Sequence, residues 1–568
     1  MTAAIYYHPE AYTTSGPKLM GRNAAGESFL RGYITHSNAK TFWAQVESTD
    51  HAQMFAQTVQ KYGRSEKVKV VDKIGLGALA QPGLVYCPGP SIGKHAFHRA
   101  AFGHGTWSLC GITHTTSSSG AMDGLVELIT APVQPWDALI CTSNAVKDNV
   151  SGLLQLQVDY LKDRLGISKI ILPQLPIIPL GIHTQDFAFS TEQKADARKT
   201  LNLSNDTLVV LFMGRLSFHA KAHPLAMYQA LELAARSTGK EVLLLECGWH
   251  ANEFIAKAYS DAARLACPSV RVVTLDGRKA EDRQIAWASA DVFCSLSDNI
   301  QETFGIVPIE AMAAGIPVVV SDWDGYKDTV RHGVDGFRIP THMPQANLGG
   351  DLAYRHALEI DTYDMYCGHT CSLVAVDVQA TAAAFEQLFK FPELRHQMGA
   401  AGQQRARALY DWKTIIGQYE ALWADLSEIR LSQSKELQPL VHPWPARMDP
   451  FHAFANYPTK VITPQTLLAL VDTDSKMAIE RAVSYRQLAM VDFAKFILPT
   501  EVEIHAVLSA ASSTPQTAQA LILSIEPARQ AFVFRALAWF LKMGVLCEKS
   551  AGKKDQTDHK FSGLQGSA

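Results

Sequence analysis

The sequence lacks the features that would indicate a secreted or membrane-spanning protein. Its nine cysteines are odd in number and scattered over 568 residues, which is typical of a reduced, cytoplasmic chain rather than of a disulfide framework. No apolar run approaches the roughly 20 residues that a helix needs to span a bilayer. The N-terminus lacks the basic start and apolar core of a secretory leader. We therefore expect a cytoplasmic location.

The chain also lacks a strong excess of charge of either sign. It has 52 basic and 55 acidic residues and a formal net charge of −3, so its composition gives no indication of nucleic-acid binding. A local basic patch and a peripheral membrane contact stay open. Apolar residues make up 47% of the chain and charged residues 19%. These fractions predict a folded chain, and its length predicts more than one domain.

Motifs that would indicate a bound cofactor or metal are incomplete. Residues 75–80 imitate a dinucleotide fingerprint, but the following Gln-Pro-Gly at 81–83 stops the helix that must face the pyrophosphate. In residues 93–95, a histidine stands where a phosphate loop needs Ser or Thr. Two cysteines and a histidine at 367–371 have a spacing that we interpret as a surface loop. We expect neither a cofactor nor a metal ion.

Short apolar runs alternate with helical patterns from about residue 85 to 425. This alternation predicts parallel strands in doubly wound α/β sheets, covered by helices on both faces. The pattern forms two blocks, which we assign to domains at 1–184 and 185–430. A long helix at 403–428 is expected to end the second block. The apolar run at 169–181 is expected to be a strand close to the hinge between the blocks.

The last part of the chain has a different character. Prolines and aromatic residues at 431–462 indicate a linker, and helical periodicity at 463–550 predicts a mainly helical accessory domain. Thr463 is expected to cap a helix whose first turn holds Pro464. The polar tail at 551–568 is expected to be disordered.

The segment 286–340 is the most informative part of the sequence. It predicts a strand, a polar loop, a helix that Gly305 opens and Gly315 closes, and a second strand. Unpaired amides at 304–307, together with the positive end of the helix dipole, could hold a diphosphate. The predicted donor-binding positions in this loop and first turn are Thr303, Phe304, Gly305, Ile306 and Val307.

Two glutamates flank the start of this helix. Glu302 lies in the preceding loop, where its carboxylate could accept hydroxyls of a sugar. Glu310 lies about one and a half turns into the helix, where it could accept both hydroxyls of a ribose. Two glutamates at this spacing are ordinarily solvated surface groups. The surrounding strand, loop and helix are what favour a binding role.

Glu302-x7-Glu310 within ETFGIVPIEAMAAGIPVV resembles the signature of the family-4 glycosyltransferases, which have the GT-B fold. The resemblance extends over about residues 20–425. It implies two Rossmann-like domains that face a cleft, and retaining transfer from a UDP- or GDP-sugar to a glycan, lipid or protein acceptor without a metal. It also implies that Glu302 contacts the donor sugar and Glu310 the ribose.

Further residues resemble other elements of that family. Gly214-Arg215-Leu216, followed by Lys221, is similar to an element whose Arg and Lys neutralise the donor phosphates. Here the lysine stands one position later than in the family pattern. Gly26-Glu27 resembles a glycine-rich loop that approaches the donor. His114 resembles a histidine near the sugar that could bond a hydroxyl or hold charge in the transition state.

Other functions remain open at this point. A GT-B epimerase or phosphorylase is one alternative, although no lysine for pyridoxal phosphate can be identified. A catalytically inactive sensor of nucleotide sugars or carbohydrates is another. The C-terminal domain could bind a protein, a membrane surface, a polymer acceptor or a second copy. A winged-helix module is conceivable, but the lack of a basic recognition helix argues against DNA binding.

Overall fold

The computed structural model describes residues 2–14, 21–437, 440, 442–472 and 474–549. The chain divides into two compact units, Met1–Pro445 and Ala446–Ala568, which are described separately below. The tail predicted at 551–568 lies outside the described residues. Every helix in the described part of the chain is too short or too polar to cross a bilayer. All nine cysteines are free thiols.

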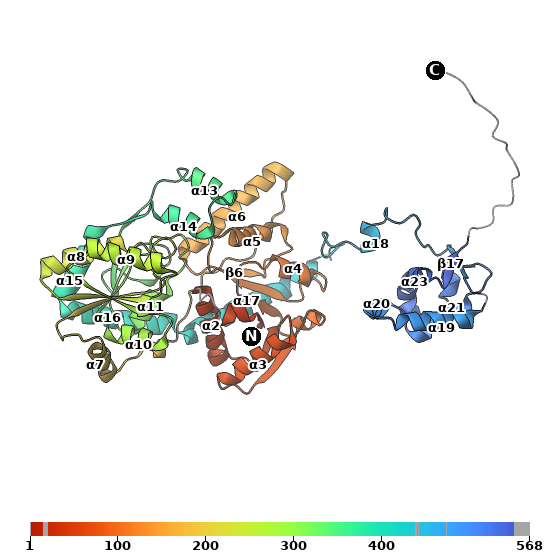
Figure 1. Ribbon diagram of the computed structural model, residues 1–568, viewed down its shortest axis with the longest axis horizontal. Coiled ribbons are helices and arrows are strands. Elements are labelled where there is room, and N and C mark those ends of the chain that lie inside the picture. The colour runs from red at the N-terminus through yellow and green to blue at the C-terminus, as the bar shows by residue number, and fades with distance from the viewer. Residues whose placement is uncertain (1, 15–20, 438–439, 441, 473, 550–568) are drawn as a thin grey trace, which may run out of the picture. The chain divides into compact units, whose positions relative to one another are not determined.

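The first unit begins with a six-stranded parallel sheet in the order β3-β2-β1-β4-β5-β6 (Figure 1). Strands β4, β5 and β6 are short and fully buried, as expected for parallel strands covered on both faces. The strands are β1 Ala4–Tyr6, β2 Thr41–Gln45, β3 Lys67–Val71, β4 Leu84–Tyr86, β5 Ser108–Ile112 and β6 Ala138–Ile140. The helices are α1 Pro9–Tyr12, α2 Gly21–His36, α3 Thr49–Lys61, α4 Gly93–Ala100, α5 Ser119–Thr130 and α6 Asn144–Leu165, with a short 3-10 turn η1 at Leu76–Ala80.

A second six-stranded parallel sheet follows, in the order β12-β11-β10-β7-β8-β9. Alternate residues of β7 pack into two different cores, Val209 and Leu211 on one face and Val210 and Phe212 on the other. The strands are β7 Leu208–Met213, β8 Val242–Gly248, β9 Arg271–Asp276, β10 Val292–Ser295, β11 Val318–Ser321 and β12 Gly336–Ile339. The helices are α7 Thr191–Thr200, α8 Leu225–Thr238, α9 Glu253–Ala266, α10 Ala280–Ser289, α11 Ile306–Ala313, α12 Tyr326–Thr329, α15 Val378–Lys390 and α16 Pro392–Arg405, with a 3-10 turn η2 at Thr184–Phe187.

The strand order reverses direction at β1/β4 in the first sheet and at β10/β7 in the second. Ligands of open α/β sheets bind beyond the carboxyl ends of the strands at such switch points. The predicted fold class, two doubly wound domains in the GT-B arrangement, is confirmed by this topology.

An insertion interrupts the second domain between β12 and α15. It consists of β13 Thr341–His342, α13 Gly350–Ala357, α14 Tyr363–Cys371 and β14 Ala375–Val376, and β13 pairs antiparallel with β14. The prediction of a surface loop at 367–371 is wrong, because these residues lie in α14 and both cysteines are buried. Among the described residues, no cluster of His, Cys, Asp and Glu could hold a metal ion.

The helix expected to close the second domain packs on the first domain instead. A π-helical turn at Ala406–Tyr410 ends α16, and α17 then runs over Trp412–Gln433. Trp412, Tyr419 and Trp423 of α17 are fully buried. Their rings meet first-domain rings, with Trp412 5.8 Å from Phe29 and Trp423 5.8 Å from Tyr33. The helix predicted at 403–428 is therefore divided, with residues 403–405 ending α16 and residues 412–433 packing on the first domain as α17.

The run at 169–181 does not form the predicted continuous strand. It makes only isolated bridges, from Gln174 to Ala138 and from Ile177 to Cys141. Prolines recur every third residue in this run, at 173, 176 and 179. Because proline has no backbone N–H, a regular ladder cannot continue along it.

The second unit contains helices around a small antiparallel sheet, in the order β16-β15-β17. The helix predicted from Pro464 is absent, and β15 occupies Leu467–Leu470 with its last three residues buried. This apolar run is short and pairs on both sides, which favours a strand. The other elements are α18 Pro450–Ala453, α19 Ser475–Arg486, α20 Ala489–Asp492, η5 Lys495–Ile497, α21 Glu501–Ala510, β16 Gln516–Thr517, α22 Ala518–Leu521, α23 Pro527–Lys542 and β17 Leu546–Glu548. In the first unit, the short turn η4 at Ser434–Glu436 extends α17 into the stretch predicted as linker.

Trp412→Ala should destabilise the first unit strongly. The indole is fully buried, and its Nε1 donates to Ser28 Oγ at 2.7 Å. Emptying such a site costs about 3–5 kcal/mol. We expect a clearly lower thermal unfolding midpoint in differential scanning calorimetry. Leu431→Ala, at an exposed position of the same helix, should change the midpoint little. Equal midpoints for the two variants would contradict the role given to α17.

Candidate active site

The helix α11 begins where the sequence predicts, directly after Gly305. Gly305 has a φ of 80°, in the left-handed region that favours glycine. A Cβ atom at this position would also overlap the ring of Tyr326. Tyr326 is held in turn by a hydrogen bond of 2.9 Å between its hydroxyl and Ser295 Oγ, at the end of β10. Strand, loop and helix thus fix one another around a residue without a side chain.

Glu302 joins the start of α11 to the loop that follows β7. Its Oε2 lies 2.5 Å from Nζ of Lys221, and its Oε1 accepts the N–H of Gly305 at 3.1 Å. Burial alone would raise the pKa of Glu302, but the Lys221 ammonium and nearby backbone amides outweigh it and hold the pKa below its ordinary value. Glu302 is therefore a carboxylate bound between two positive groups.

One part of the prediction for this helix is wrong. The amide of Gly305 is not unpaired, because it donates to Glu302. A carboxylate at a helix N-terminus is stabilised by the helix dipole. Here that carboxylate is the side chain of Glu302, in the preceding loop. Phe304 is buried, and Ile306 and Val307 form the first turn of the helix beside it.

Glu310 lies on the same helix in a different electrostatic environment. Within the described residues its carboxyl group has no hydrogen-bond partner. Burial raises its pKa to about 8, and the nearby charge of Arg283 only partly opposes this shift. Glu310 is therefore mostly protonated at neutral pH in the structure as it stands.

Arg215 and Lys221 both lie in the segment after β7. The guanidinium of Arg215 donates to the Ala220 carbonyl at 2.9 Å and lies 3.5 Å from Oε1 of Gln301. Gln301 also donates to the Ala220 carbonyl. The structure thus brings Arg215, Lys221 and the Glu302 loop together, as the sequence predicts.

Gly26 and Glu27 do not form the predicted glycine-rich loop, because both lie inside α2. A Cβ atom at Gly26 would overlap the carbonyl group of Ala11. The glycine therefore permits close packing of α1 against α2. The carboxylate of Glu27 accepts a hydrogen bond from the Thr14 hydroxyl.

His114 follows β5 and lies against the second domain. Its backbone carbonyl accepts a hydrogen bond of 3.0 Å from Thr303 Oγ1. Burial lowers the pKa of its imidazole to about 4, so the ring is neutral at neutral pH. This leaves the predicted hydrogen-bonding role open and disfavours the predicted role as a charge carrier.

Hydroxyl groups of the first domain hold the Glu302 loop from the other side. The carbonyl of Thr303 accepts hydrogen bonds from Thr142 Oγ1 at 3.2 Å and from Ser143 Oγ at 2.9 Å. Ser143 also caps α6 by accepting the amide of Val146. The sequence analysis missed this contact, although Ser143 stands at a recognisable helix cap.

Two aspartates of the second domain complete this contact. Asp328 accepts the backbone N–H of Asn144 at 2.7 Å, at the start of α6. Asp324 Oδ1 accepts a hydrogen bond from Ser143 Oγ at 3.1 Å, and within the described residues its buried Oδ2 has no hydrogen-bond partner. Burial, with a smaller contribution from Glu302, raises the pKa of Asp324 to about 8. Neither aspartate could be identified from the sequence alone.

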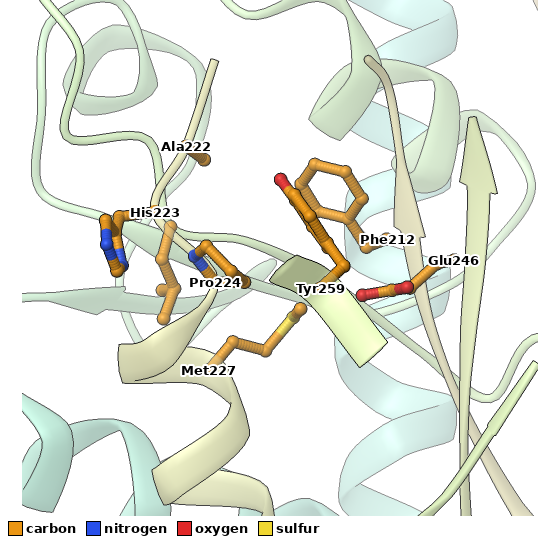
Figure 2. A pocket seen from close by; sticks show the side chains of 8 residues that line it. Phe212, Ala222, His223, Pro224, Met227, Glu246 and Tyr259 are labelled. Atoms are coloured by element: carbon orange, nitrogen blue, oxygen red, sulfur yellow. The ribbon is translucent and has the colours of Figure 1, made fainter. Parts of the chain in front are cut away.

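Two hollows in the second domain lie apart from this constellation. One is a cavity of about 10 Å³ that Glu246 and Tyr259 line together with Phe212 and Met227. Figure 2 shows these side chains. A space of that size holds about one water molecule. A wider groove of about 420 Å³ runs beside α9 and shares Glu246 and Tyr259. Neither hollow is lined by the predicted donor-binding residues.

Comparison with known proteins finds a similarity in the middle of the chain. Residues 193–348 match the family described as glycosyl transferases group 1. This segment is similar to that family. It contains the loop after β7, the Glu302 loop and the whole of α11.

Curated relatives carry related names. An uncharacterized glycosyltransferase of Methanocaldococcus jannaschii is 26% identical over 43% of this chain and 60% of its own. A D-inositol 3-phosphate glycosyltransferase of Corynebacterium diphtheriae is 24% identical over 45% of this chain and 52% of its own. A phosphatidyl-myo-inositol mannosyltransferase of Mycobacterium leprae is 32% identical over 26% of this chain and 31% of its own. The chain thus spans less than two thirds of the length of these relatives.

Solved structures with a similar backbone fold include HepE of Anabaena in complex with UDP. It is 16% identical, with a TM-score of 0.49, over 75% of this chain and 100% of its own. Sucrose-phosphate synthase of Thermosynechococcus elongatus is 18% identical, with a TM-score of 0.46, over 75% of this chain and 98% of its own.

Glu310→Gln should flatten the dependence of stability on pH. The pKa of Glu310 is raised from 4.5 to about 8, so the folded state binds more protons than the unfolded state between these values. The resulting stability is present below pH 4.5 and is lost as the pH rises towards 8. We expect the melting temperature of wild type to fall over this pH range. The melting temperature of the variant should fall less. Glu253→Gln, at an exposed position, serves as the control. Parallel curves for wild type and Glu310→Gln would contradict the assignment.

Proposed function

We propose that this protein is a retaining glycosyltransferase that moves a sugar from a UDP- or GDP-sugar to an acceptor hydroxyl. The observation that carries the proposal is the Lys221–Glu302 pair at the start of α11. Glu310 on the same helix and Arg215 beside the same loop complete a donor site. All four residues lie within the segment of the glycosyl transferases group 1 family.

The donor diphosphate would lie against Arg215, Lys221 and the first amides of α11. A phosphate oxygen would replace the Glu302 carboxylate at the N–H of Gly305, since both are anions that suit this position. Glu302 would then be free to accept hydroxyls of the transferred sugar. Glu310 would accept the ribose hydroxyls, one on each carboxylate oxygen.

The reaction breaks the bond between the anomeric carbon and the diphosphate oxygen, and forms a bond from that carbon to the acceptor oxygen. The proton of the acceptor hydroxyl passes to the departing phosphate oxygen on the same face of the sugar. Arg215 and Lys221 offset the charge that gathers on the nucleoside diphosphate. His114, as a neutral imidazole, would hydrogen-bond a sugar hydroxyl.

The names of the relatives support glycosyl transfer as the reaction class. They concern inositol phosphate in one group of proteins and phosphatidyl-myo-inositol in another. For this chain we propose only an acceptor that carries hydroxyl groups, such as a glycan, a lipid or a protein.

Glu310→Ala should abolish transfer and weaken nucleotide binding, because the ribose loses its acceptor. Glu302→Ala should abolish transfer with a smaller loss of nucleotide affinity, because this side chain contacts the sugar. Calorimetry with UDP and GDP measures binding, and nucleotide release from a panel of UDP- and GDP-sugars measures transfer. The expected loss of transfer is a fall in kcat of about 10²–10³, the size seen when one oxyanion-hole donor is removed.

Glu253→Ala, at an exposed position on α9, provides the matched control and should behave as wild type. Full turnover by both active-site variants at saturating donor would remove the assignments. Tight nucleotide-sugar binding by wild type without any product would instead favour a catalytically inactive sensor.

We also propose that transfer needs no added metal. Arg215 and Lys221 would supply the positive charge that a metal ion supplies at other diphosphate sites. Nucleotide release should therefore be the same after treatment with excess EDTA and dialysis as before it. Loss of activity that Mg²⁺ or Mn²⁺ restores would contradict this proposal.

A further inference from the structure

The inserted helix α14 connects the donor loop to the first domain. Its Gly368 packs against His219, so closely that a Cβ atom would lie 2.9 Å from the histidine Cβ. At its other end, the hydroxyl of Tyr363 lies 3.3 Å from Thr115 Oγ1 and 3.3 Å from Ser117 Oγ, both in the first domain. The helix therefore extends from the neighbourhood of Lys221 to the residues that follow His114.

Tyr363 belongs to a cluster of uncharged polar groups. Thr115 and Ser117 lie 3.1 Å apart, and the Tyr363 hydroxyl lies 3.4 Å from Oε1 of Gln301. Gln301 immediately precedes Glu302. None of the four groups carries a charge, and all can exchange hydrogen bonds with the hydroxyls of a ligand.

These contacts are long for hydroxyl hydrogen bonds, which are commonly about 2.7–2.8 Å between oxygen atoms. Contacts of 3.1–3.4 Å satisfy the three hydroxyl groups only weakly, whereas Gln301 also donates to the Ala220 carbonyl. Thr115 and Tyr363 are also only partly buried. A ligand that offered adjacent hydroxyls could replace these contacts with shorter ones.

The position of α14 is firmly braced. The buried carboxylate of Asp361, two residues before Tyr363, accepts Nε of Arg355 at 2.9 Å and lies 3.1 Å from Nδ1 of His369. Thr362 caps the helix by accepting the amide of Met365. The phenol of Tyr363 is therefore presented from a fixed helix rather than from a loop, which suits a recognition site.

We infer that Tyr363, Thr115, Ser117 and Gln301 form the subsite for the acceptor, and that the acceptor presents uncharged vicinal hydroxyl groups. This inference rests on the proposed function and adds the substrate class. The inserted α14 supplies the second-domain side of the subsite. This subsite lies next to His114 and to the proposed position of the donor sugar. A free polyol and the polyol headgroup of a lipid share this chemistry.

The test compares Tyr363→Phe with Tyr366→Phe. Tyr366 is on the same helix but stacks on His356 at 4.1 Å, so its variant controls for a change in α14 itself. Acceptors are myo-inositol and glycerol in solution, and phosphatidylinositol in detergent micelles. Initial rates give KM and kcat for acceptor and donor, and hydrolysis of the donor without acceptor gives a separate readout.

Tyr363→Phe should raise the acceptor KM about tenfold, as expected for one lost hydrogen bond, and should leave kcat, donor KM and donor hydrolysis nearly unchanged. Tyr366→Phe should match wild type. A preference for myo-inositol or glycerol would identify a free polyol, and a preference for the micelles a lipid headgroup. An unchanged acceptor KM would overturn the inference, and so would equal changes in donor KM and hydrolysis, which indicate a purely structural contact.

Binding measured by saturation-transfer NMR, with myo-inositol or glycerol in the presence of UDP, separates this inference from the proposed function. If wild type released no nucleotide but bound a polyol and Tyr363→Phe bound it more weakly, only the proposed reaction would fail. If wild type bound neither polyol nor micellar headgroup, the acceptor subsite would be refuted even with nucleotide release intact.

Discussion

The placement of one carboxylate, that of Glu302, governs the rest of the site. It lies between the ammonium of Lys221 and the amide of Gly305, and so couples the loop after β7 to the start of α11. Taking an ion pair out of water carries a large desolvation cost, and such pairs are weak evidence for stability. In the proposed site, the pair prepares a position where an ammonium group and a backbone N–H face an anion. The glycine at 305 makes this possible, because any side chain there would meet Tyr326.

The same loop is also where the two domains touch. The carbonyl of Thr303 accepts hydrogen bonds from the hydroxyls of Thr142 and Ser143, and the Thr303 hydroxyl donates to the carbonyl of His114. Any movement of one domain relative to the other must therefore break or remake bonds to the residue next to Glu302. The packing of α17 also joins the two domains. This helix follows the second domain in sequence, but its rings pack on the first domain.

The sequence predicts the parts of the structure that depend on local pattern. Buried apolar runs gave the strands β7, β8, β10 and β11, and Gly305 marked the start of α11. The sequence alone does not predict the features that depend on tertiary packing. Helix α17 has the pattern of an ordinary closing helix, and only the rings it meets show which domain it covers. Gly26 resembles a loop glycine because sequence does not show the carbonyl of Ala11 beside it. Asp324 and Tyr363 reach their partners across the domain contact, so no sequence spacing could indicate them.

The two glutamates of the motif illustrate why residue type alone does not define a role. Both are partly buried, yet Glu302 is held as a carboxylate and Glu310 has a pKa raised to about 8. The difference follows from their partners. Lys221 and the loop amides stabilise charge at Glu302, whereas burial outweighs the charge of Arg283 at Glu310 and Asp186 adds to the rise in its pKa. A ribose that donated two hydroxyls to Glu310 would favour its ionised form, so nucleotide binding would release a proton there. The phosphate, by contrast, would compete with Glu302 for positive partners. Binding of one donor would therefore shift the two carboxyl groups in opposite electrostatic directions.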